Sequence, residues 1–157
     1  MRLWRLTREP FVALDGAGAE HHGGRYSSPG LPLVPLASEA GLAVLIALRY
    51  LPQDKERWPR DFVLGWTEIA AIPERLDGQA GSDHSDDAVR TQVVRWHGEQ
   101  RSLLAAVRSR VLPEADVVLL NPRHPDAGRV PPLVTRPFDF AECLHHPPML
   151  PRYWNTA

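Results

Sequence analysis

The sequence predicts a single α+β domain, in which short strands and two helices are mixed without strict alternation. Its 157 residues are the size of one domain with one hydrophobic core. Its 16 prolines and 11 glycines favour many short elements joined by turns over a bundle of helices. Because no repeat and no linker divides the chain, we expect one domain over residues 1–157, with a core over residues 3–140 and an irregular tail over residues 147–157.

Short apolar runs predict the strands. Residues 3–6 and residues 62–69 combine apolar and β-favouring side chains, which indicates an opening strand and another further along the chain. The β-branched run 117–120 predicts a buried strand. Residues 31–36 contain prolines at 32 and 35, so this run is expected to form an edge strand at best. Residues 138–140 are the candidate for a last strand.

Capping residues and helical spacing predict two helices. Ser38 can cap the first, which continues with leucine and isoleucine at helical spacing and ends before Pro52. Asp86 or Asp87 can cap the second, which continues with valines and a tryptophan. The polar, glycine-bearing stretch 78–87 is expected to be a loop.

The balance of charge excludes some classes of function. There are 18 basic and 19 acidic side chains, with a formal net charge of −1, so we expect no direct binding to nucleic acids. Residues 1–6 lack the apolar core of a signal peptide, and the longest apolar run, residues 41–48, is too short to span a bilayer. The single cysteine, Cys143, cannot form an internal disulfide. These features predict a cytoplasmic protein without a membrane anchor.

Two pairs of adjacent histidines, at 21–22 and 145–146, raise the question of a metal site. Adjacent side chains point in different directions, and no cysteine or acidic partner recurs at the spacing of metal ligands. We therefore interpret these histidines as surface or loop residues and expect no metal.

The most informative segment is the glycine-rich stretch 15–30, which carries Arg25 and Tyr26. A guanidinium on such a loop suits bidentate capture of a phosphate, and the neighbouring ring can stack on a base or a nicotinamide. The glycine spacing differs from the dinucleotide-binding fingerprint, since no strong strand precedes it and no helix follows the glycines. A tight turn with a solvated arginine fits the same residues and is favoured when the segment is considered alone.

Two further polar positions also have both a structural and a chemical interpretation. Ser109 can be a nucleophile or a hydrogen-bond donor, but no Gly-x-Ser-x-Gly elbow surrounds it. The stretch Asn121-Pro122-Arg123-His124-Pro125 is typical of a turn whose side chains cap backbone groups. Taken singly, both positions are interpreted as structural.

In their order and spacing, these segments together resemble the RES family. The resemblance spans residues 3–140, nearly the whole chain. It rests on the opening strand, the Gly-x-Gly-Ala run at 16–19, the stretch Gly23-Gly24-Arg25-Tyr26-Ser27-Ser28-Pro29-Gly30, the helix over residues 38–51, the Val-x-Ser segment that ends at Ser109, and the Asn-Pro-x-His-Pro motif at 121–125.

The resemblance implies an ADP-ribosyltransferase-like fold, with two small mixed sheets and a few helices around a cleft. It also implies a toxin that consumes NAD, by degrading it or by transferring ADP-ribose, and that assembles with an Xre-like antitoxin in a hetero-oligomer. Arg25 would hold the NAD phosphates, and Ser109 would line the pocket as the second catalytic residue. Tyr26 would keep the aromatic plane that a tryptophan supplies in the family. NAD is then the substrate, and no metal takes part.

The sequence departs from the family at positions that carry its chemistry. The family's pocket tyrosine falls on Pro35 and its glutamate on Ile46, so the pocket should be more apolar and lack the carboxylate that stabilises positive charge on the ribose. Glu39 and Glu68 are the candidates to compensate. Two functions stay open: an NAD-consuming toxin with altered residues, and a catalytically silent protein that binds a partner or a nucleotide. We expect Arg25 on the floor of the cleft near the start of the first helix, with Ile46 facing the same cleft.

Overall fold

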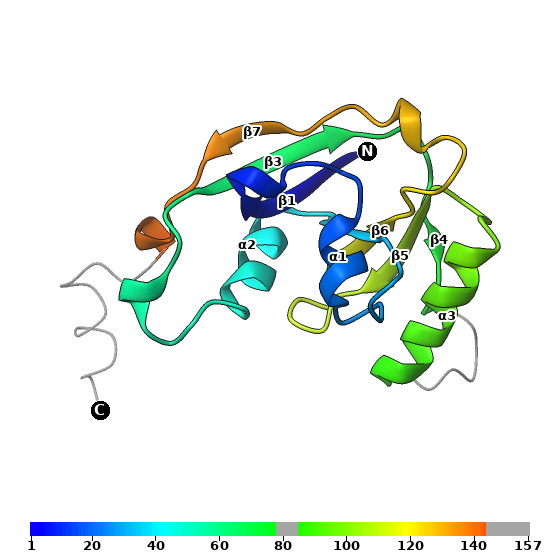
Figure 1. Ribbon diagram of the computed structural model, residues 1–157, viewed down its shortest axis with the longest axis horizontal. Coiled ribbons are helices and arrows are strands. Elements are labelled where there is room, and N and C mark those ends of the chain that lie inside the picture. Colours follow the sequence, from blue (N-terminus) through cyan, green and yellow to red (C-terminus); the bar gives the residue numbers. More distant parts are fainter. Residues whose placement is uncertain (78–84, 144–157) are drawn as a thin grey trace.

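The computed structural model describes residues 1–77 and 85–143. In this part of the chain, one seven-stranded sheet has the strand order β4-β5-β6-β2-β1-β3-β7 (Figure 1). The strands are β1 (Arg2–Arg8), β2 (Val34–Ala37), β3 (Phe62–Glu68), β4 (Glu74–Arg75), β5 (Leu104–Arg108), β6 (Asp116–Leu120) and β7 (Val134–Pro137). The α-helices of the described residues are α1 (Ala17–His22), α2 (Ala40–Leu48) and α3 (Asp86–Gly98), and short 3₁₀ turns cover Glu9–Phe11, Lys55–Arg57, Ala127–Arg129 and Phe140–Cys143. The expected α+β class is confirmed.

The sheet consists of two halves that meet at one point. β1 and β3 pair along all seven residues of both strands, and β7 adds to the outer edge of β3. β2, β6 and β5 form the antiparallel ladder of the other half, with β4 parallel to β5 at its edge. Between the halves, β1 and β2 pair only at Trp4 and Ala37. The two small sheets expected from the sequence are thus halves of one sheet, because this single pair links their ladders.

Strand β2 lies in the middle of the sheet, so the expectation of an edge strand is wrong. Its whole length pairs with β6, from Val34 with Leu120 to Ala37 with Val117. Proline is tolerated at position 35 because β2 leaves most of its other edge unpaired, and the missing N–H of Pro35 therefore costs no ladder hydrogen bond.

Strands β5 and β6 carry the centre of the core and are buried on both faces. Val117 of β6 belongs to one buried cluster with Trp96 of α3, whereas Val118 belongs to another with Leu3 of β1. Burial on both faces requires a continuous apolar run instead of an alternating one. The buried strand predicted over residues 117–120 is confirmed.

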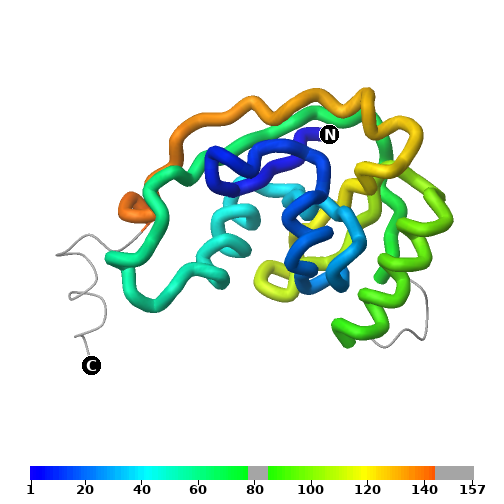
Figure 2. Tube along the Cα trace, viewed as in Figure 1, coloured from blue at the N-terminus to red at the C-terminus, as the bar shows by residue number. Residues whose placement is uncertain are grey.

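All three helices contact the same face of the sheet. Ala19 of α1, Ile46 of α2 and Val89 of α3 pack against the buried cluster that contains Trp96. In Figures 1 and 2, α2, α1 and α3 follow one another along the lower side of the molecule, with β1 and β3 above α1 and α2. No helix within residues 1–77 and 85–143 is long and apolar enough to cross a membrane.

The first predicted helix exists but begins later than expected. α2 starts at Ala40, and its N-cap, Glu39, makes no side-chain capping bond. The Ser38 hydroxyl instead accepts a hydrogen bond from the N–H of Asp116 in β6, at 3.0 Å. Ser38 therefore ties the end of β2 to β6, and this bond takes the place of the predicted cap.

The second predicted helix is α3, and its cap is one residue earlier than expected. The Ser85 hydroxyl accepts a hydrogen bond from the N–H of Ala88, at 3.3 Å. Asp86 and Asp87 are thus the first residues of the helix, where negative charges interact favourably with the helix dipole. Residues 78–84 of the expected loop lie outside the described residues.

Two other local expectations are wrong. Part of the glycine-rich stretch, Ala17–His22, is helical, because Gly16 adopts a left-handed φ of 75° that lets the chain turn into α1. The last strand is β7, whereas Phe140 begins a 3₁₀ turn and packs edge-on against Phe62, with 4.9 Å between ring centroids. The tail expected over residues 147–157 lies outside the described residues.

The predicted turn at residues 121–125 is confirmed. Asn121 is fully buried, and its amide nitrogen donates to the carbonyl of His97 at 3.1 Å. Its amide oxygen accepts from the N–H of Arg123 at 2.9 Å. The side chain therefore caps backbone groups on both sides and joins this turn to the end of α3.

Gly16→Ala should destabilise the protein far more than Gly18→Ala. Gly16 is buried with a φ of 75°, and a Cβ there would lie 2.6 Å from the nitrogen of Leu33. Such a backbone conformation costs a non-glycine residue about 1–3 kcal/mol before any clash. Gly18 lies in α1, and an added Cβ there would meet nothing within 4 Å, so alanine should be neutral or stabilise by about 0.5–1 kcal/mol. Urea unfolding measures both variants, and equal stabilities would contradict the close approach at Gly16.

Candidate functional site

One cavity of about 220 Å³ brings together the positions singled out in the sequence. Arg25, Tyr26, Pro35, Ile46 and Ser109 all line it. They come from the loop after α1, from β2, from α2 and from the end of β5. Residues far apart in the sequence therefore meet at one place, and Ile46 faces the same cavity as Arg25.

A compact glycine turn presents Arg25 and Tyr26 to this cavity. Gly23 ends α1 with a φ of 67°. The N–H of Gly24 donates to the carbonyl of Ser27 at 2.8 Å, which folds the chain tightly around the two side chains between them. A Cβ at position 23 would lie 3.0 Å from that same carbonyl oxygen, so the turn requires glycine.

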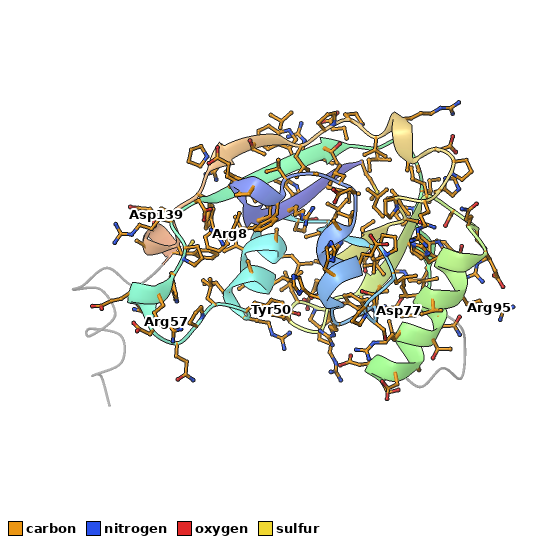
Figure 3. All side chains as sticks on the ribbon, in the orientation of Figure 1. Arg8, Tyr50, Arg57, Asp77, Arg95 and Asp139 are labelled. Carbon is orange, nitrogen blue, oxygen red and sulfur yellow. The ribbon has the colours of Figure 1, made fainter. Side chains whose placement is uncertain are left out.

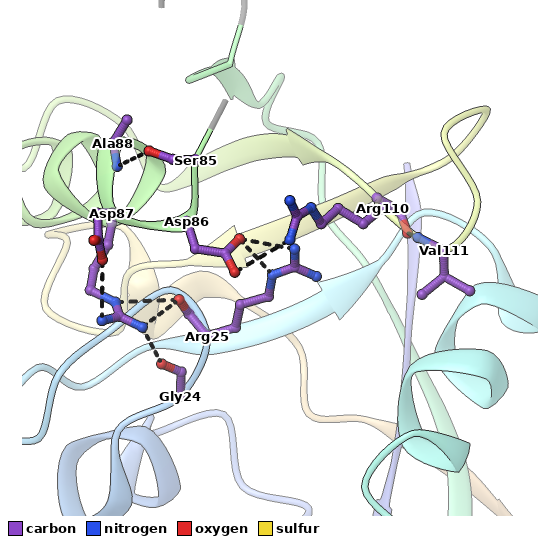
Figure 4. Close-up of polar contacts among 10 residues, drawn as sticks. Gly24, Arg25, Ser85, Asp86, Asp87, Ala88, Arg110 and Val111 are labelled. Atoms are coloured by element: carbon purple, nitrogen blue, oxygen red, sulfur yellow. Dashed lines mark hydrogen bonds and ion pairs between the residues drawn. The ribbon is translucent and has the colours of Figure 1, made fainter. Parts of the chain in front are cut away.

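A carboxylate from α3 contacts Arg25. Nε and Nη2 of Arg25 donate to Oδ1 of Asp86 at 3.2 and 3.0 Å (Figure 4). The other oxygen of Asp86 lies 3.5 Å from Nη1 of Arg110. The hydrogen bond from Arg25 holds the pKa of the Asp86 carboxyl below its ordinary value. Asp86 is thus an anion shared by two arginines at the start of a helix.

Tyr26 supplies a flat and partly buried ring beside this arginine. The guanidinium carbon of Arg25 lies 5.6 Å from the centroid of the Tyr26 ring. Burial raises the pKa of the Tyr26 phenol, so the ring is neutral at physiological pH. A neutral aromatic wall next to a cation is suited to a ligand that carries both an aromatic ring and phosphate groups.

Ser109 is buried, and its hydroxyl shapes the turn between β5 and β6. Its Oγ accepts hydrogen bonds from the N–H groups of Val111 and Leu112, both at 3.3 Å. In the described part of the chain, the hydroxyl hydrogen has no protein acceptor. Ser109 can therefore hold the turn and still donate one hydrogen bond into the cavity.

The wall opposite Arg25 is apolar. Ile46 packs against two core clusters, and Pro35 is exposed beside it. Tyr50 follows just beyond the C-terminal end of α2 and borders the same cavity (Figure 3). Arg25 thus faces the C-terminal end of α2. The expectation that Arg25 lies near the start of this helix is wrong, because α2 runs back along β2 before it reaches the cavity.

Two larger cavities adjoin the first and, with it, form what we call the cleft. Their volumes are about 470 and 550 Å³, within the usual range for ligand sites, and Pro35 lines all three. Asp15 is the one carboxylate among the described residues that line the cleft. Glu39 does not line it, and Glu68 pairs with Arg2 at 2.6 Å beside a separate cavity. Neither glutamate therefore takes the place of the missing carboxylate.

Arg5 is a candidate that the sequence did not reveal. Its side chain lines both larger cavities of the cleft, and Nη1 donates to the carbonyl of Ala13 at 3.0 Å. Among the described residues, no carboxylate is within ion-pair distance of Arg5. Burial lowers the pKa of the Arg5 guanidinium, although the negative charge of Asp15 raises it in part. A half-buried cation with spare donors and no close counter-ion is suited to an anionic ligand. An arginine within an opening strand gives no sign of this in the sequence.

The structure places the first histidine pair at the end of α1. His21 and His22 are exposed and line the cavity of about 550 Å³. Within residues 1–77 and 85–143, no group of three histidine, cysteine or acidic residues is arranged to hold a metal ion. The second pair, at 145–146, lies outside the described residues.

Comparisons with known proteins agree on one family. The family model of the RES domain matches residues 2–141. Toxin Res of Pseudomonas putida is 31% identical over 133 residues, which cover 81% of this chain and 88% of that protein. The Prs ADP-ribosylating toxin of a Sphingobium species is 35% identical over 139 residues, which cover 79% and 84%. A crystal structure of the M. tuberculosis MbcT-MbcA toxin-antitoxin complex has a similar fold, with a TM-score of 0.66 at 18% identity over 90% of this chain and 85% of the compared one.

Arg5→Met should leave the free energy of unfolding unchanged or raise it. The substitution removes a partly desolvated charge with one hydrogen bond to protein and keeps an apolar stem of similar length. Leu3→Ala on the same strand is the control, since Leu3 is fully buried and its truncation should cost about 2–5 kcal/mol. Urea unfolding compares the two, and a loss in Arg5→Met as large as that in Leu3→Ala would mean that Arg5 has a structural role instead.

Proposed function

Because this chain belongs to the RES domain family, we propose that it is a toxin that binds NAD in the cleft and consumes it. The observation that carries the proposal is the convergence of Arg25, Tyr26 and Ser109 on one cavity. Arg5 adds a second cation to the adjoining part of the cleft. The relatives named as toxins, one of them ADP-ribosylating, support the same function.

Each of these side chains has a role in the proposed complex. Arg25 and Arg5 both line the cavity of about 550 Å³ and would bind the two phosphates of NAD. Tyr26 would stack on an aromatic ring of NAD, and the Ser109 hydroxyl would donate to a ribose or amide oxygen. No metal takes part in this scheme.

The proposed reaction begins by breaking the bond between the ribose and nicotinamide. The electron pair leaves with the nicotinamide nitrogen, and positive charge develops on the ribose until water, phosphate or a protein side chain donates a pair of electrons to it. Ile46 supplies no charge to stabilise this intermediate stage. Losing such an electrostatic contribution typically lowers the rate by about 10²–10³. We therefore expect a slow enzyme.

A second candidate function rests on the same apolar wall. With Pro35 and Ile46 in the cavity and no carboxylate among its described lining residues, the cleft is equipped for binding more than for catalysis. In this alternative the protein holds NAD, or another nucleotide, without cleaving it.

We also propose an Xre-like antitoxin as the partner, in a cytoplasmic hetero-oligomer. The similar fold found in a toxin-antitoxin complex supports a partner of this kind. Phe11 and Tyr50 border the cleft with 57% and 73% of their surfaces exposed, so a bound partner could cover both side chains.

Nicotinamide release from NAD tests the proposed enzyme. The native chain should release nicotinamide slowly, and Arg25→Ala should abolish release because the phosphates lose their cation. Ile46→Glu should raise the rate by about 10²–10³ by restoring the carboxylate. Leu45→Glu is the matched control, since Leu45 precedes Ile46 in α2, is 38% exposed and does not line the cavity.

The possible outcomes separate the two candidate functions. Release that depends on Arg25 supports the NAD-consuming toxin. Binding of NAD without release, with activity gained in Ile46→Glu and not in Leu45→Glu, supports the silent binding protein. A chain that neither binds NAD nor gains activity in Ile46→Glu contradicts the NAD-consuming toxin and also the silent protein that holds NAD.

A further inference from the structure

The first two turns of α3 hold the proposed phosphate-binding arginine by two separate contacts. Asp86, the first residue of α3, accepts hydrogen bonds from the Arg25 side chain at 3.2 and 3.0 Å. Arg90, one turn further along α3, donates to the backbone carbonyls of Arg25 at 3.1 Å and Gly24 at 3.4 Å. One rigid element therefore fixes both the backbone and the side chain of Arg25.

Asp86 contacts Arg25 but does not line the cleft. None of the three cavities of the cleft is lined by Asp86. It borders a neighbouring cavity, which Arg25, Ser109 and Arg110 also line. The carboxylate therefore does not occupy the space in which a ligand of the cleft would bind.

The contact uses only one edge of the guanidinium. Asp86 accepts from Nε and Nη2, and Nη1 of Arg25 has no acceptor among the described residues. The Arg25 side chain is 19% exposed, and that of Asp86 is 46% exposed. A guanidinium fixed along its Nε edge can still present Nη1 and the second hydrogen of Nη2 to a phosphate, and a fixed donor loses less entropy when the ligand binds.

We propose that Asp86 is a positioning residue that orients Arg25 for the phosphates of a dinucleotide bound in the cleft. The inference rests on the proposed binding of NAD and adds a residue that the RES-family pattern in this sequence does not include. Asp86 acts through Arg25 and touches no part of the ligand. Arg110, which contacts the second oxygen of Asp86, balances the charge that the carboxylate brings to the site.

The test is the dissociation constant for NAD, measured by calorimetry with the full chain and its Asp86→Asn variant. Asparagine keeps the size of the side chain but loses the charge that holds Arg25. We expect binding about tenfold weaker, the loss typical of one weakened charge-assisted hydrogen bond. Asp86→Glu keeps the carboxylate and should bind within about threefold of the native chain.

Asp87→Asn is the matched control. It removes the same charge from the same turn of α3, but the Asp87 side chain is 95% exposed and, among the described residues, pairs with Arg90 alone, at 4.0 Å. It should bind NAD as the native chain does. Thermal unfolding checks that both asparagine variants are folded; Asp86→Asn should unfold at a somewhat lower temperature, because it also loses the contacts to Arg25 and Arg110.

Each outcome supports or overturns the proposal. Weaker binding in Asp86→Asn alone, restored in Asp86→Glu, supports it. Tighter binding of NAD by Asp86→Asn would overturn the proposal, because Asp86 would then compete with the phosphate for Arg25. Equal affinities of Asp86→Asn and Asp87→Asn for NAD would also overturn it, because the contact with Arg25 would then have only a structural role. A native chain that binds no NAD would remove the proposed function and this inference together, whereas native binding with an unaffected Asp86→Asn variant would remove the inference alone.

Discussion

Strands β1 and β2 are neighbours in the sheet but pair at one position, Trp4 with Ala37, and the cleft lies along the rest of their length. A complete ladder would close this space with backbone hydrogen bonds. Instead, Arg5 from β1 and Pro35 from β2 both border the cleft. The other site residues reach the same space because α2 runs back along β2 and the glycine turn after α1 folds over it. The site therefore depends on a sheet whose two halves are joined by one residue pair and left open beside it.

The cleft combines two chemically different walls. One wall carries Arg5 and Arg25, two cations suited to an anionic ligand. Asp86, which does not line the cleft, fixes the side chain of Arg25. On the other wall, Pro35 and Ile46 carry no charged or hydrogen-bonding group. In the proposed complex, binding of the phosphates and stabilisation of the ribose charge would use different walls, so binding can persist where turnover is slow.

The sequence predicts those parts of the fold that local chemistry determines. The run 117–120 is apolar at every position because β6 is buried on both faces. Asn121 comes next and caps backbone groups with its side chain, which forms the turn. The residues around Arg25, considered alone, favour a turn with a solvated arginine, and it is the resemblance to the RES family that predicts the pocket which Arg25 lines. The helix cap predicted at Ser38 is wrong because a serine before a helix can bond either to that helix or to a strand. Only the tertiary structure brings the N–H of Asp116 within reach of its hydroxyl. Arg5 and Asp86 could not be found for the same reason, since their burial and their partners come from distant parts of the chain.

The position of NAD in the cleft is the most direct test of this account. A crystal structure of the chain soaked with NAD, or with ADP-ribose if NAD is consumed, would determine it. The account predicts the two phosphates between Arg5 and Arg25, an aromatic ring against Tyr26, and an Arg25 side chain that still contacts Asp86. A dinucleotide bound outside the cleft, or phosphates that contact neither arginine, would contradict it.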